Sequence, residues 1–324
     1  MMKPIIAISM GDPAGISPEI IAAGLEDAVS ICRPLVFGHY PTMKAALTGD
    51  WAERLVCLDT PAPVEDGMVG FVSVGEGDEV IRSPGREAGR IQLEALDAAT
   101  TAVLDGPCLA LVTAPVAKHA IASLGVAFSG HTEYLAKRAG LEKDDVTMVF
   151  ASMELCVGMV TTHLPLREVP DAVTWKRLDR TFRHVVETRR RIKPDAPLSI
   201  AVAALNPHAG EDGMFGTEEQ TLLAPFCEAM AEDENIEVCG PLPGDMVYRD
   251  ALSGKYCGVV AGYHDQALIP LKLGGVGRMV NVTMGLPFIR TSPDHGVAYE
   301  IARKGVADPS GLKSALQMAV RLSG

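Results

Sequence analysis

The sequence predicts an α/β protein with a mainly parallel sheet. Short apolar runs typical of strands alternate with helical patterns along the whole 324-residue chain, and that order is typical of parallel sheets. The run Cys108–Thr113 is largely apolar without alternation, as expected of a strand covered by helices on both faces. A chain of this length is also expected to divide into two lobes.

The first half of the chain begins with a strand over Pro4–Met10. The helix Ser17–Glu26 follows, because Ser17 is a good cap and Pro18 suits the first helical position. Further strands are expected at Leu35–Phe37, Leu55–Leu58, Val69–Val74 and Cys108–Thr113, and further helices at Pro41–Leu47, Ser83–Leu104, Val116–Leu124 and Glu133–Ala139.

The second half continues the alternation. Strands are expected at Thr147–Ala151, Leu155–Thr161, Leu198–Ala203, Ile236–Cys239 and Tyr256–Ala261, and helices at Trp175–Lys193, Glu218–Ala231, Gly296–Arg303 and Ser310–Leu322. We expect loops at Asn206–Gly216 and from His264 onwards, and a turn at Pro241–Asp245. No linker is visible, so we expect a discontinuous lobe, residues 1–130 plus about 280–324, and a second lobe of about 131–279.

Composition excludes several classes of protein. The 41 acidic residues outnumber the 29 basic ones, giving a net charge of −12, which argues against binding to nucleic acid or to an anionic membrane. No run of about eighteen apolar residues is present, and the N-terminal apolar run fits a first strand better than a signal peptide. The seven cysteines are scattered and form no Cys-x-x-Cys. We therefore predict a cytoplasmic protein whose cysteines are core residues.

The segment Gly262–Gly296 is the richest in chemically active residues. It carries His264, two cations (Lys272 and Arg290) and the glycine-rich turn at 274–277. Cations and free backbone N–H groups suit a phosphate or a carboxylate, and imidazole suits a divalent metal. The segment therefore predicts a binding site.

Three histidines follow predicted strands at equivalent positions: His163, His208 and His264. Ligands of open α/β sheets bind beyond the carboxyl ends of strands, so three imidazoles there would form an open metal site. For any one of them, a loop histidine satisfied by hydrogen bonds remains the alternative.

Other motifs allow two interpretations each. His131 and Thr132 stand at a helix start in Gly130–Glu133, where they would bind a phosphate or only cap the helix. The stretches 11–19 and 206–216 are either functional loops or tight surface turns. No Gly-x-Gly-x-x-Gly follows a strand, which argues against a standard Rossmann site.

Seven ordered blocks resemble the PdxA family, the 4-hydroxythreonine-4-phosphate dehydrogenases of vitamin B6 biosynthesis, along essentially the whole chain. The blocks are GDPAGISPE (11–19), VTAPVAK (112–118), GHTEYLA (130–136), TTHLPL (161–166), LNPHAGEDGMFG (205–216), GYHDQALIPLK (262–272) and VNVTMGLPFIRTSPDHG (280–296).

The resemblance implies an isocitrate/isopropylmalate-dehydrogenase-like α/β/α fold, with two lobes, an active site in the cleft between them, and an obligate homodimer. It implies a divalent metal (Zn, Mg, Co or Mn) shared across the dimer interface and held by His163, His208 and His264. Substrate contacts would come from His131, Thr132, Lys272, Asn281 and Arg290. NAD would bind in a non-Rossmann manner along Gly275, Asn281, Leu286, Pro287, Asp294 and His295.

The implied reaction is NAD-dependent oxidation of 4-phosphohydroxy-L-threonine, followed by decarboxylation to 3-amino-2-oxopropyl phosphate. The metal would lower the pKa of the substrate hydroxyl and stabilise the enolate. Lys272 and Arg290 would hold the phosphate and the carboxylate. Lys272 would also carry protons, with Asp245 and Asp265 supporting the histidines.

Alternative functions remain open. Similar paralogues oxidise D-threonate or D-erythronate 4-phosphate, and others act on aromatic cis-dihydrodiols. A three-histidine zinc hydrolase, with Glu211 or Asp265 as base, would need no NAD. A non-catalytic organic-phosphate-binding protein would need no metal. Nicotinamide reduction together with bound metal distinguishes the dehydrogenase from both.

Overall fold

The computed structural model describes residues 3–233, 235–274 and 279–324. The chain forms two compact units, unit 1 (residues 1–143 and 286–324) and unit 2 (residues 144–285). Unit 1 is thus discontinuous and carries both ends of the chain. Along the chain, the boundaries between the units fall at 143/144 and 285/286, whereas the predicted lobe boundaries lie near 130 and 280.

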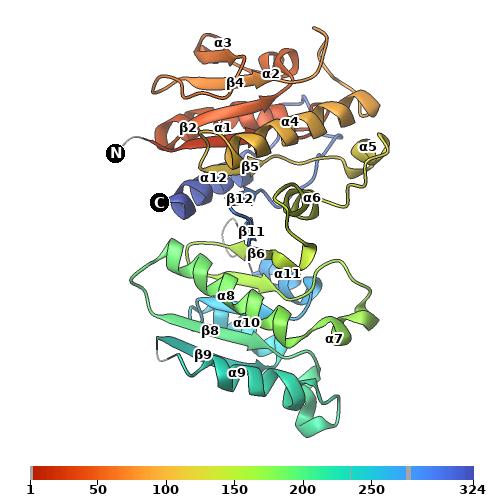
Figure 1. The fold of residues 1–324 in the computed structure, drawn as a ribbon, viewed down its shortest axis with the longest axis vertical. Helices are drawn as coiled ribbons and strands as arrows, with labels where there is room; N and C mark the ends of the chain where they lie inside the picture. Colours follow the sequence, from red (N-terminus) through yellow and green to blue (C-terminus); the bar gives the residue numbers. More distant parts are fainter. Residues whose placement is uncertain (1–2, 234, 275–278) are drawn as a thin grey trace. The chain divides into compact units, whose positions relative to one another are not determined.

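Unit 1 contains a wholly parallel set of strands (Figure 1). They are β1 (Ile5–Ser9), β2 (Arg33–Gly38), β3 (Leu55–Leu58), β4 (Val69–Ser73), β5 (Ala110–Thr113) and β12 (Ile289–Ser292). Their order is β3-β4-β2-β1-β5-β12, and each pairing is parallel. The carboxyl ends of β5 and β12 therefore lie side by side.

Helices cover both faces of that sheet. They are α1 (Ser17–Ile31), α2 (Tyr40–Ala46), α3 (Trp51–Arg54), α4 (Arg86–Leu104), α5 (Lys118–Ala122), α6 (His131–Arg138) and α12 (Ser310–Ser323). Leu96 of α4 packs in one core cluster with Ala7 and Leu111. Side chains alternate between the two faces of a sheet, so the strand residues next to Ala7 and Leu111 point to the opposite face. On that face α1 and α12 pack together, and a Cβ on Gly24 of α1 would lie 3.9 Å from Leu312 of α12. The predicted double coverage is confirmed.

Unit 2 has a mixed sheet. Its strands are β6 (Thr147–Ala151), β7 (Cys156–Met159), β8 (Leu198–Ala203), β9 (Ile236–Leu242), β10 (Gly258–Ala261) and β11 (Val280–Met284), in the order β11-β6-β7-β10-β8-β9. Among the described strands of this unit, β6 alone runs antiparallel to its neighbours, β7 and β11, and a short turn joins it to β7. The prediction of a mainly parallel sheet is therefore confirmed.

The helices of unit 2 lie on opposite faces of its sheet. They are α7 (Val169–Ala172), α8 (Trp175–Ile192), α9 (Ala224–Met230), α10 (Gly244–Leu252) and α11 (His264–Leu273). On one face, α8 packs closely against β7: a Cβ on Gly158 of β7 would lie 2.5 Å from Val185 Cγ2 of α8. Val247 of α10 and Leu268 of α11 share a core cluster with Val259 of β10, which places these two helices together on the other face.

Three local predictions are wrong. Residues 296–303 form an irregular segment and turns instead of a helix, because Ala298 (φ 45°) and Arg303 (φ 63°) are left-handed. His264 begins α11 instead of a loop; the sequence does not predict this helix because it contains Pro270, and proline disfavours helix interiors. In place of the expected turn at 241–245, β9 continues to Leu242 and α10 begins at Gly244, directly after Pro243.

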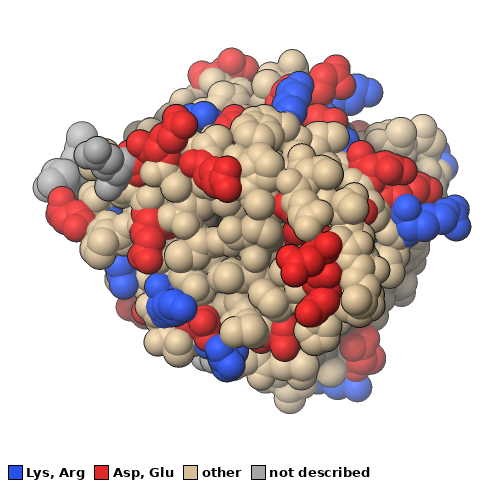
Figure 2. Space-filling model, turned by 90° about the horizontal axis from the view of Figure 1, so that it is seen from below, with Lys and Arg blue, Asp and Glu red and all other residues tan. Residues whose placement is uncertain are grey.

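On the face drawn in Figure 2, acidic, basic and uncharged side chains are interspersed. Among the described residues, no helix combines the length and the apolar character that crossing a membrane requires.

Candidate functional site

A buried cation stands at the centre of the candidate anion site of unit 1. Arg290 on β12 is only 2% exposed, and its Nε and Nη2 donate hydrogen bonds of 3.2 and 2.7 Å to Thr113 Oγ1 on β5. Burial lowers the pKa of Arg290 to about 10, against the opposing effect of Glu133. The guanidinium therefore stays charged at neutral pH and is held in one orientation.

His131, the first residue of α6, lies in the same region. Its Nε2 is shielded from solvent and has no hydrogen-bond partner among the described residues. Burial, followed by the positive charges of Arg290 and Lys118, lowers the pKa of His131 well below its ordinary value. The ring is therefore neutral at pH 7, and its Nε2 can donate to or accept from a ligand according to the tautomer.

Lys118, at the start of α5, completes this group and was not among the predicted site residues. A Cβ on Gly130 would stand 3.6 Å from Lys118 Nζ, which places the ammonium beside the first turn of α6, where Thr132 also lies. The only sequence signal for Lys118 was its place at the end of the VTAPVAK block. We call Arg290, Lys118, His131 and Thr132 the anion group, because this combination suits a phosphate or a carboxylate.

Two of the three predicted metal ligands lie together in unit 2. The rings of His163 and His264 have centroids 5.7 Å apart. Their two chain segments are joined where the strands end, because Thr161 Oγ1 donates a 2.7 Å hydrogen bond to Gly262 O. The Gln266 side chain bridges two further segments: its Oε1 accepts a hydrogen bond from Gly262 N, and its Nε2 donates one to Ala204 O, both 2.7 Å long.

His264 has the hydrogen bond expected of a metal ligand. Its Nδ1 lies 2.7 Å from Asp265 Oδ1, which leaves Nε2 as the ring nitrogen available to a ligand. Both His264 and the carboxylate are at least partly exposed. The supporting role of Asp265 at a metal site stays a prediction.

His208 lies apart from this pair, on a strained loop. His208, Ala209, Glu211 and Asp212 all have positive φ, between 42° and 53°, and such residues cost roughly 1–3 kcal/mol each. The buried Glu219 holds the base of the loop by accepting hydrogen bonds from the backbone N–H groups of Leu205 and Asn206, both 2.8 Å. The histidine itself is exposed.

No set of three or more His, Cys, Asp or Glu side chains is close enough to hold a metal within the part of the chain that the structure describes. A single chain therefore brings together His163 and His264 but not His208. The three-histidine site remains a prediction.

The remaining predicted residues have separate positions. Asn281 lies on β11, and its Oδ1 is shielded from solvent with no partner in the described chain. Lys272 is exposed in the last turn of α11, and Asp245 is exposed in the first turn of α10. Of the predicted NAD contacts, Leu286 and Pro287 lie between β11 and β12, and Asp294 and His295 are exposed after β12. Gly275 lies outside the described residues.

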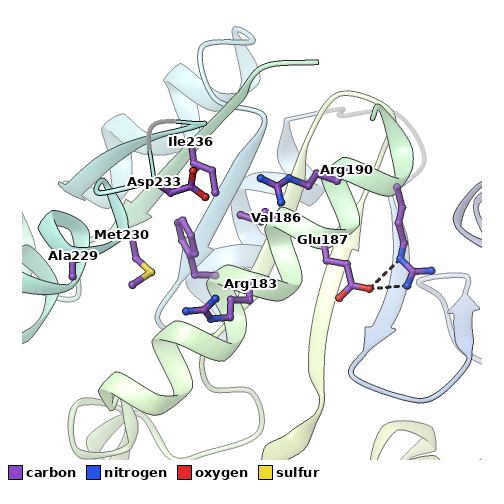
Figure 3. Close-up of a pocket in the computed structure, with 10 residues that line it drawn as sticks. Arg183, Val186, Glu187, Arg190, Ala229, Met230, Asp233 and Ile236 are labelled. Atoms are coloured by element: carbon purple, nitrogen blue, oxygen red, sulfur yellow. Dashed lines mark hydrogen bonds and ion pairs between the residues drawn. The ribbon is translucent and has the colours of Figure 1, made fainter. Parts of the chain in front are cut away.

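A pocket of about 570 Å³ on unit 2 contains none of these residues (Figure 3). It is lined by the second half of α8, the end of α9 and the start of β9, with an apolar floor that includes Phe182 and Met230. Asp233 and Ile236, which line it, precede or begin β9, so the pocket is near the amino ends of the strands. The histidines follow the carboxyl ends, so this pocket is not the candidate site.

Known proteins resemble this chain along nearly all of its length. Residues 30–319 match the family model described as "Pyridoxal phosphate biosynthetic protein PdxA". A 4-hydroxythreonine-4-phosphate dehydrogenase of Desulforapulum autotrophicum is 41% identical, with 98% of this chain and 95% of the relative aligned. A D-threonate 4-phosphate dehydrogenase of Pectobacterium atrosepticum is 40% identical, with 99% and 100% aligned.

Solved structures of dehydrogenases resemble the fold of this chain. A 4-hydroxythreonine-4-phosphate dehydrogenase of Klebsiella pneumoniae has a TM-score of 0.83 at 36% identity, covering 99% of this chain and 100% of its own. A β-decarboxylating dehydrogenase of Thermococcus kodakarensis, at 13% identity and a TM-score of 0.51, covers 98% of this chain and 82% of its own and shares the fold alone. The predicted α/β/α dehydrogenase fold is confirmed.

Proposed function

The chain belongs to the PdxA family of pyridoxal phosphate biosynthetic proteins and is a dehydrogenase, and from that premise we propose that it oxidises the secondary hydroxyl of 4-phosphohydroxy-L-threonine. The resulting β-keto acid loses carbon dioxide and gives 3-amino-2-oxopropyl phosphate. The anion group carries this proposal, because a buried, fully oriented guanidinium beside a neutral imidazole suits a small phosphorylated hydroxy acid.

NAD would supply the hydride acceptor, and a divalent metal would supply the Lewis acid that favours the alkoxide. Within the chain, the guanidinium of Arg290 is fixed by Thr113 and would orient an anionic end of the substrate. His131 and Thr132 would hydrogen-bond to the same ligand, as would Asn281. Lys272 is exposed and is our candidate for returning a proton to the carbon from which carbon dioxide leaves.

The metal ligands are proposed to come from two copies of the chain. His163 and His264 are paired in one copy, and the Asp265 contact orients His264. The separate, exposed position of His208 supports its contribution to the site of a partner copy. Imidazole nitrogens suit zinc and related divalent metals.

An exposed apolar surface next to these histidines supports a homodimer. Large apolar side chains at least 39% exposed occur on α10, on α11 and beside His208: Met246, Leu252, Ile269, Leu273, Met214 and Phe215. Exposed apolar side chains gathered on adjacent elements mark interaction surfaces. We infer that a second copy covers them.

Leu273→Asp tests the dimer, because Leu273 is 82% exposed and its replacement should leave the monomer folded. We expect the variant to sediment as a monomer and to lose bound metal. Leu109→Asp, on unit 1 at 55% exposure, is the matched control and should remain dimeric. A dimeric Leu273→Asp protein with full metal content would refute the proposed interface.

NAD is proposed to bind along Asn281, Leu286, Pro287, Asp294 and His295, with Gly275 as a further contact. Asp294 and His295 are exposed. Pro293 separates them from the end of β12, the strand that carries Arg290 at its second position. NAD and the substrate would thus both contact residues on or just beyond β12.

We propose a cytoplasmic location, since all seven cysteines are free thiols.

The second candidate substrate class is D-threonate or D-erythronate 4-phosphate, favoured by the relative of that activity at 40% identity. NADH formation by metal-loaded protein, with the three phosphates in parallel, tests both. Preference for the amino acid phosphate supports vitamin B6 synthesis, and preference for a sugar-acid phosphate supports the alternative. No NADH with any of them, despite bound metal, would contradict both and favour a hydrolase or dihydrodiol activity.

A further inference from the structure

The GDPAGISPE stretch has no role in the proposed chemistry, yet it makes a dense set of contacts within unit 1. Residues 11–19 join β1 to α1. Asp12 is completely buried; its Oδ1 accepts a 2.8 Å hydrogen bond from Ala14 N, and its Oδ2 accepts one of 2.6 Å from the Tyr299 hydroxyl. A buried carboxylate is costly unless it is hydrogen-bonded, so the Tyr299 contact is part of what keeps Asp12 in place.

A second acid of the same stretch holds the same distant segment. Glu19 accepts hydrogen bonds from the backbone N–H groups of Arg303 (2.8 Å) and Gly305 (3.3 Å). The guanidinium of Arg303 returns to the stretch and donates to Ala14 O at 3.0 Å. Two carboxylates, seven residues apart in sequence, thus hold residues 299–305.

The backbone contacts are equally close. Ile16 N donates a 3.0 Å hydrogen bond to Val297 O, and a Cβ on Gly15 would stand 2.6 Å from the same oxygen. Only glycine permits that approach. The stretch therefore follows the course of the chain from Val297 to Gly305.

Residues 297–305 form no regular helix. Ala298 (φ 45°) and Arg303 (φ 63°) are in the left-handed region, and the backbone hydrogen bonds within the segment are short-range ones, such as Ile301 N to Ala298 O at 3.2 Å. A pocket of about 460 Å³ remains where Glu19 and Pro18 approach Arg303 and Gly305. Because this side of the segment is open, the hydrogen bonds to Asp12 and Glu19 contribute much of what holds it against the stretch, together with the Arg303–Ala14 and Ile16–Val297 contacts.

We propose that Asp12 and Glu19 are positioning residues for the cofactor. By fixing residues 297–305 they hold the exposed Asp294–His295–Gly296, which directly precede that segment, in the conformation that receives the dinucleotide. The inference rests on the proposed NAD site. A loop that is ordered before binding costs less conformational entropy when the ligand arrives, so these acids act on NAD affinity without touching NAD.

Tyr299→Phe and Glu19→Gln test this role. Tyr299→Phe removes a hydrogen bond to a carboxylate and Glu19→Gln weakens two of them, so we expect NAD affinity, titrated in the absence of substrate, to fall roughly tenfold. Metal content and substrate KM should stay close to wild type, and the thermal midpoint should fall by only about a few degrees. In Glu19→Gln, the amides of Arg303 and Gly305 should also exchange with solvent faster. Asp12→Asn provides a second route to the Tyr299 contact.

Glu94→Gln is the matched control. Glu94 also accepts a hydrogen bond from a backbone N–H in unit 1, from Gly75 at 3.0 Å, and its other carboxylate oxygen pairs with Arg90. Neither partner belongs to the stretch or to residues 297–305. We expect its NAD affinity to be that of the wild type, so a general effect of removing an acid from unit 1 would be recognised here.

The outcomes separate the two proposals. If the wild-type protein reduces or binds no NAD, the proposed function fails, and this inference fails with it. If the wild type binds NAD and the variants bind it equally well, the positioning role is overturned while the proposed function stands. An equal loss of NAD affinity and substrate affinity would also overturn it, because it would indicate a general effect on the fold of unit 1.

Discussion

The anion group of unit 1 and the histidines of unit 2 are built in opposite ways. Arg290 is buried and fixed by Thr113, and Lys118 and His131 lie around it in the same unit. In contrast, His163 and His208 are exposed, and only His163 and His264 approach each other. The four side chains of the anion group thus belong to one unit of one chain, whereas His208 does not join His163 and His264 within the described chain.

The difference follows from what each ligand requires. A phosphate is recognised best by donors that are already oriented and partly desolvated, and the core of one unit can provide this. A metal needs several converging imidazoles with one open position, and exposed histidines from two copies can meet that need only on assembly. We therefore expect phosphate binding by the anion group to be independent of protein concentration, and metal binding to be lost when the protein is diluted to monomers.

Replacement of His208 should have the largest effect. His208→Ala removes one proposed ligand, and the loss of the Lewis acid should lower kcat roughly 1,000-fold or more, together with bound metal. Because His208 is exposed, the thermal midpoint of the metal-free protein should not change. His119→Ala, an exposed histidine of unit 1, is the control. An active His208→Ala enzyme with normal metal content would remove His208 from the site.

Replacement of Arg290 should have the next largest effect, and it should change substrate binding by the anion group without changing metal binding. Arg290→Met removes a buried cation whose charged hydrogen bonds to a ligand are worth roughly 1.5–3 kcal/mol, so the substrate KM should rise by roughly 10- to 100-fold. Metal content should be unchanged. Steady-state kinetics with metal analysis test this, and a variant that lost its metal would show that the two groups are not independent.

Asp265→Asn should have an intermediate effect on the metal alone. The carboxylate contacts His264 Nδ1 at 2.7 Å, and loss of such a partner lowers metal affinity roughly 10-fold. Competition with a chelator measures this affinity. Unchanged affinity would mean that Asp265 does not orient His264.

The smallest effect concerns pH. Burial disfavours the charged form of Arg290 and brings its pKa down to about 10, so the cation, and with it substrate affinity, is lost as the pH rises through that value. In Arg290→Lys, the same burial would act on a lysine, whose ordinary pKa is about 10.4. The alkaline limb of kcat/KM should therefore move to lower pH. An identical limb in both proteins would exclude Arg290 as its origin.

Most of the strand and helix pattern could be predicted from local sequence. The α8 helix was expected at Trp175–Lys193 and is found at Trp175–Ile192, because its apolar periodicity is strong. In contrast, α11 was missed because Pro270 interrupts its pattern. Residues 296–303 were assigned to a helix because their sequence does not show that Asp12 and Glu19, almost 300 residues away, would hold them in another conformation.

The sequence by itself determined the alternation of strands and helices, the family blocks, and the identity of His131, Thr132 and Arg290 as candidate ligand residues. Only the tertiary structure decided that His131 is neutral, that Lys118 belongs beside it, and that His208 is separate from His163 and His264 within one chain. The physical reason is that burial, charge proximity and hydrogen bonds such as those from Arg290 to Thr113 depend on residues far apart in the chain, which no local pattern records.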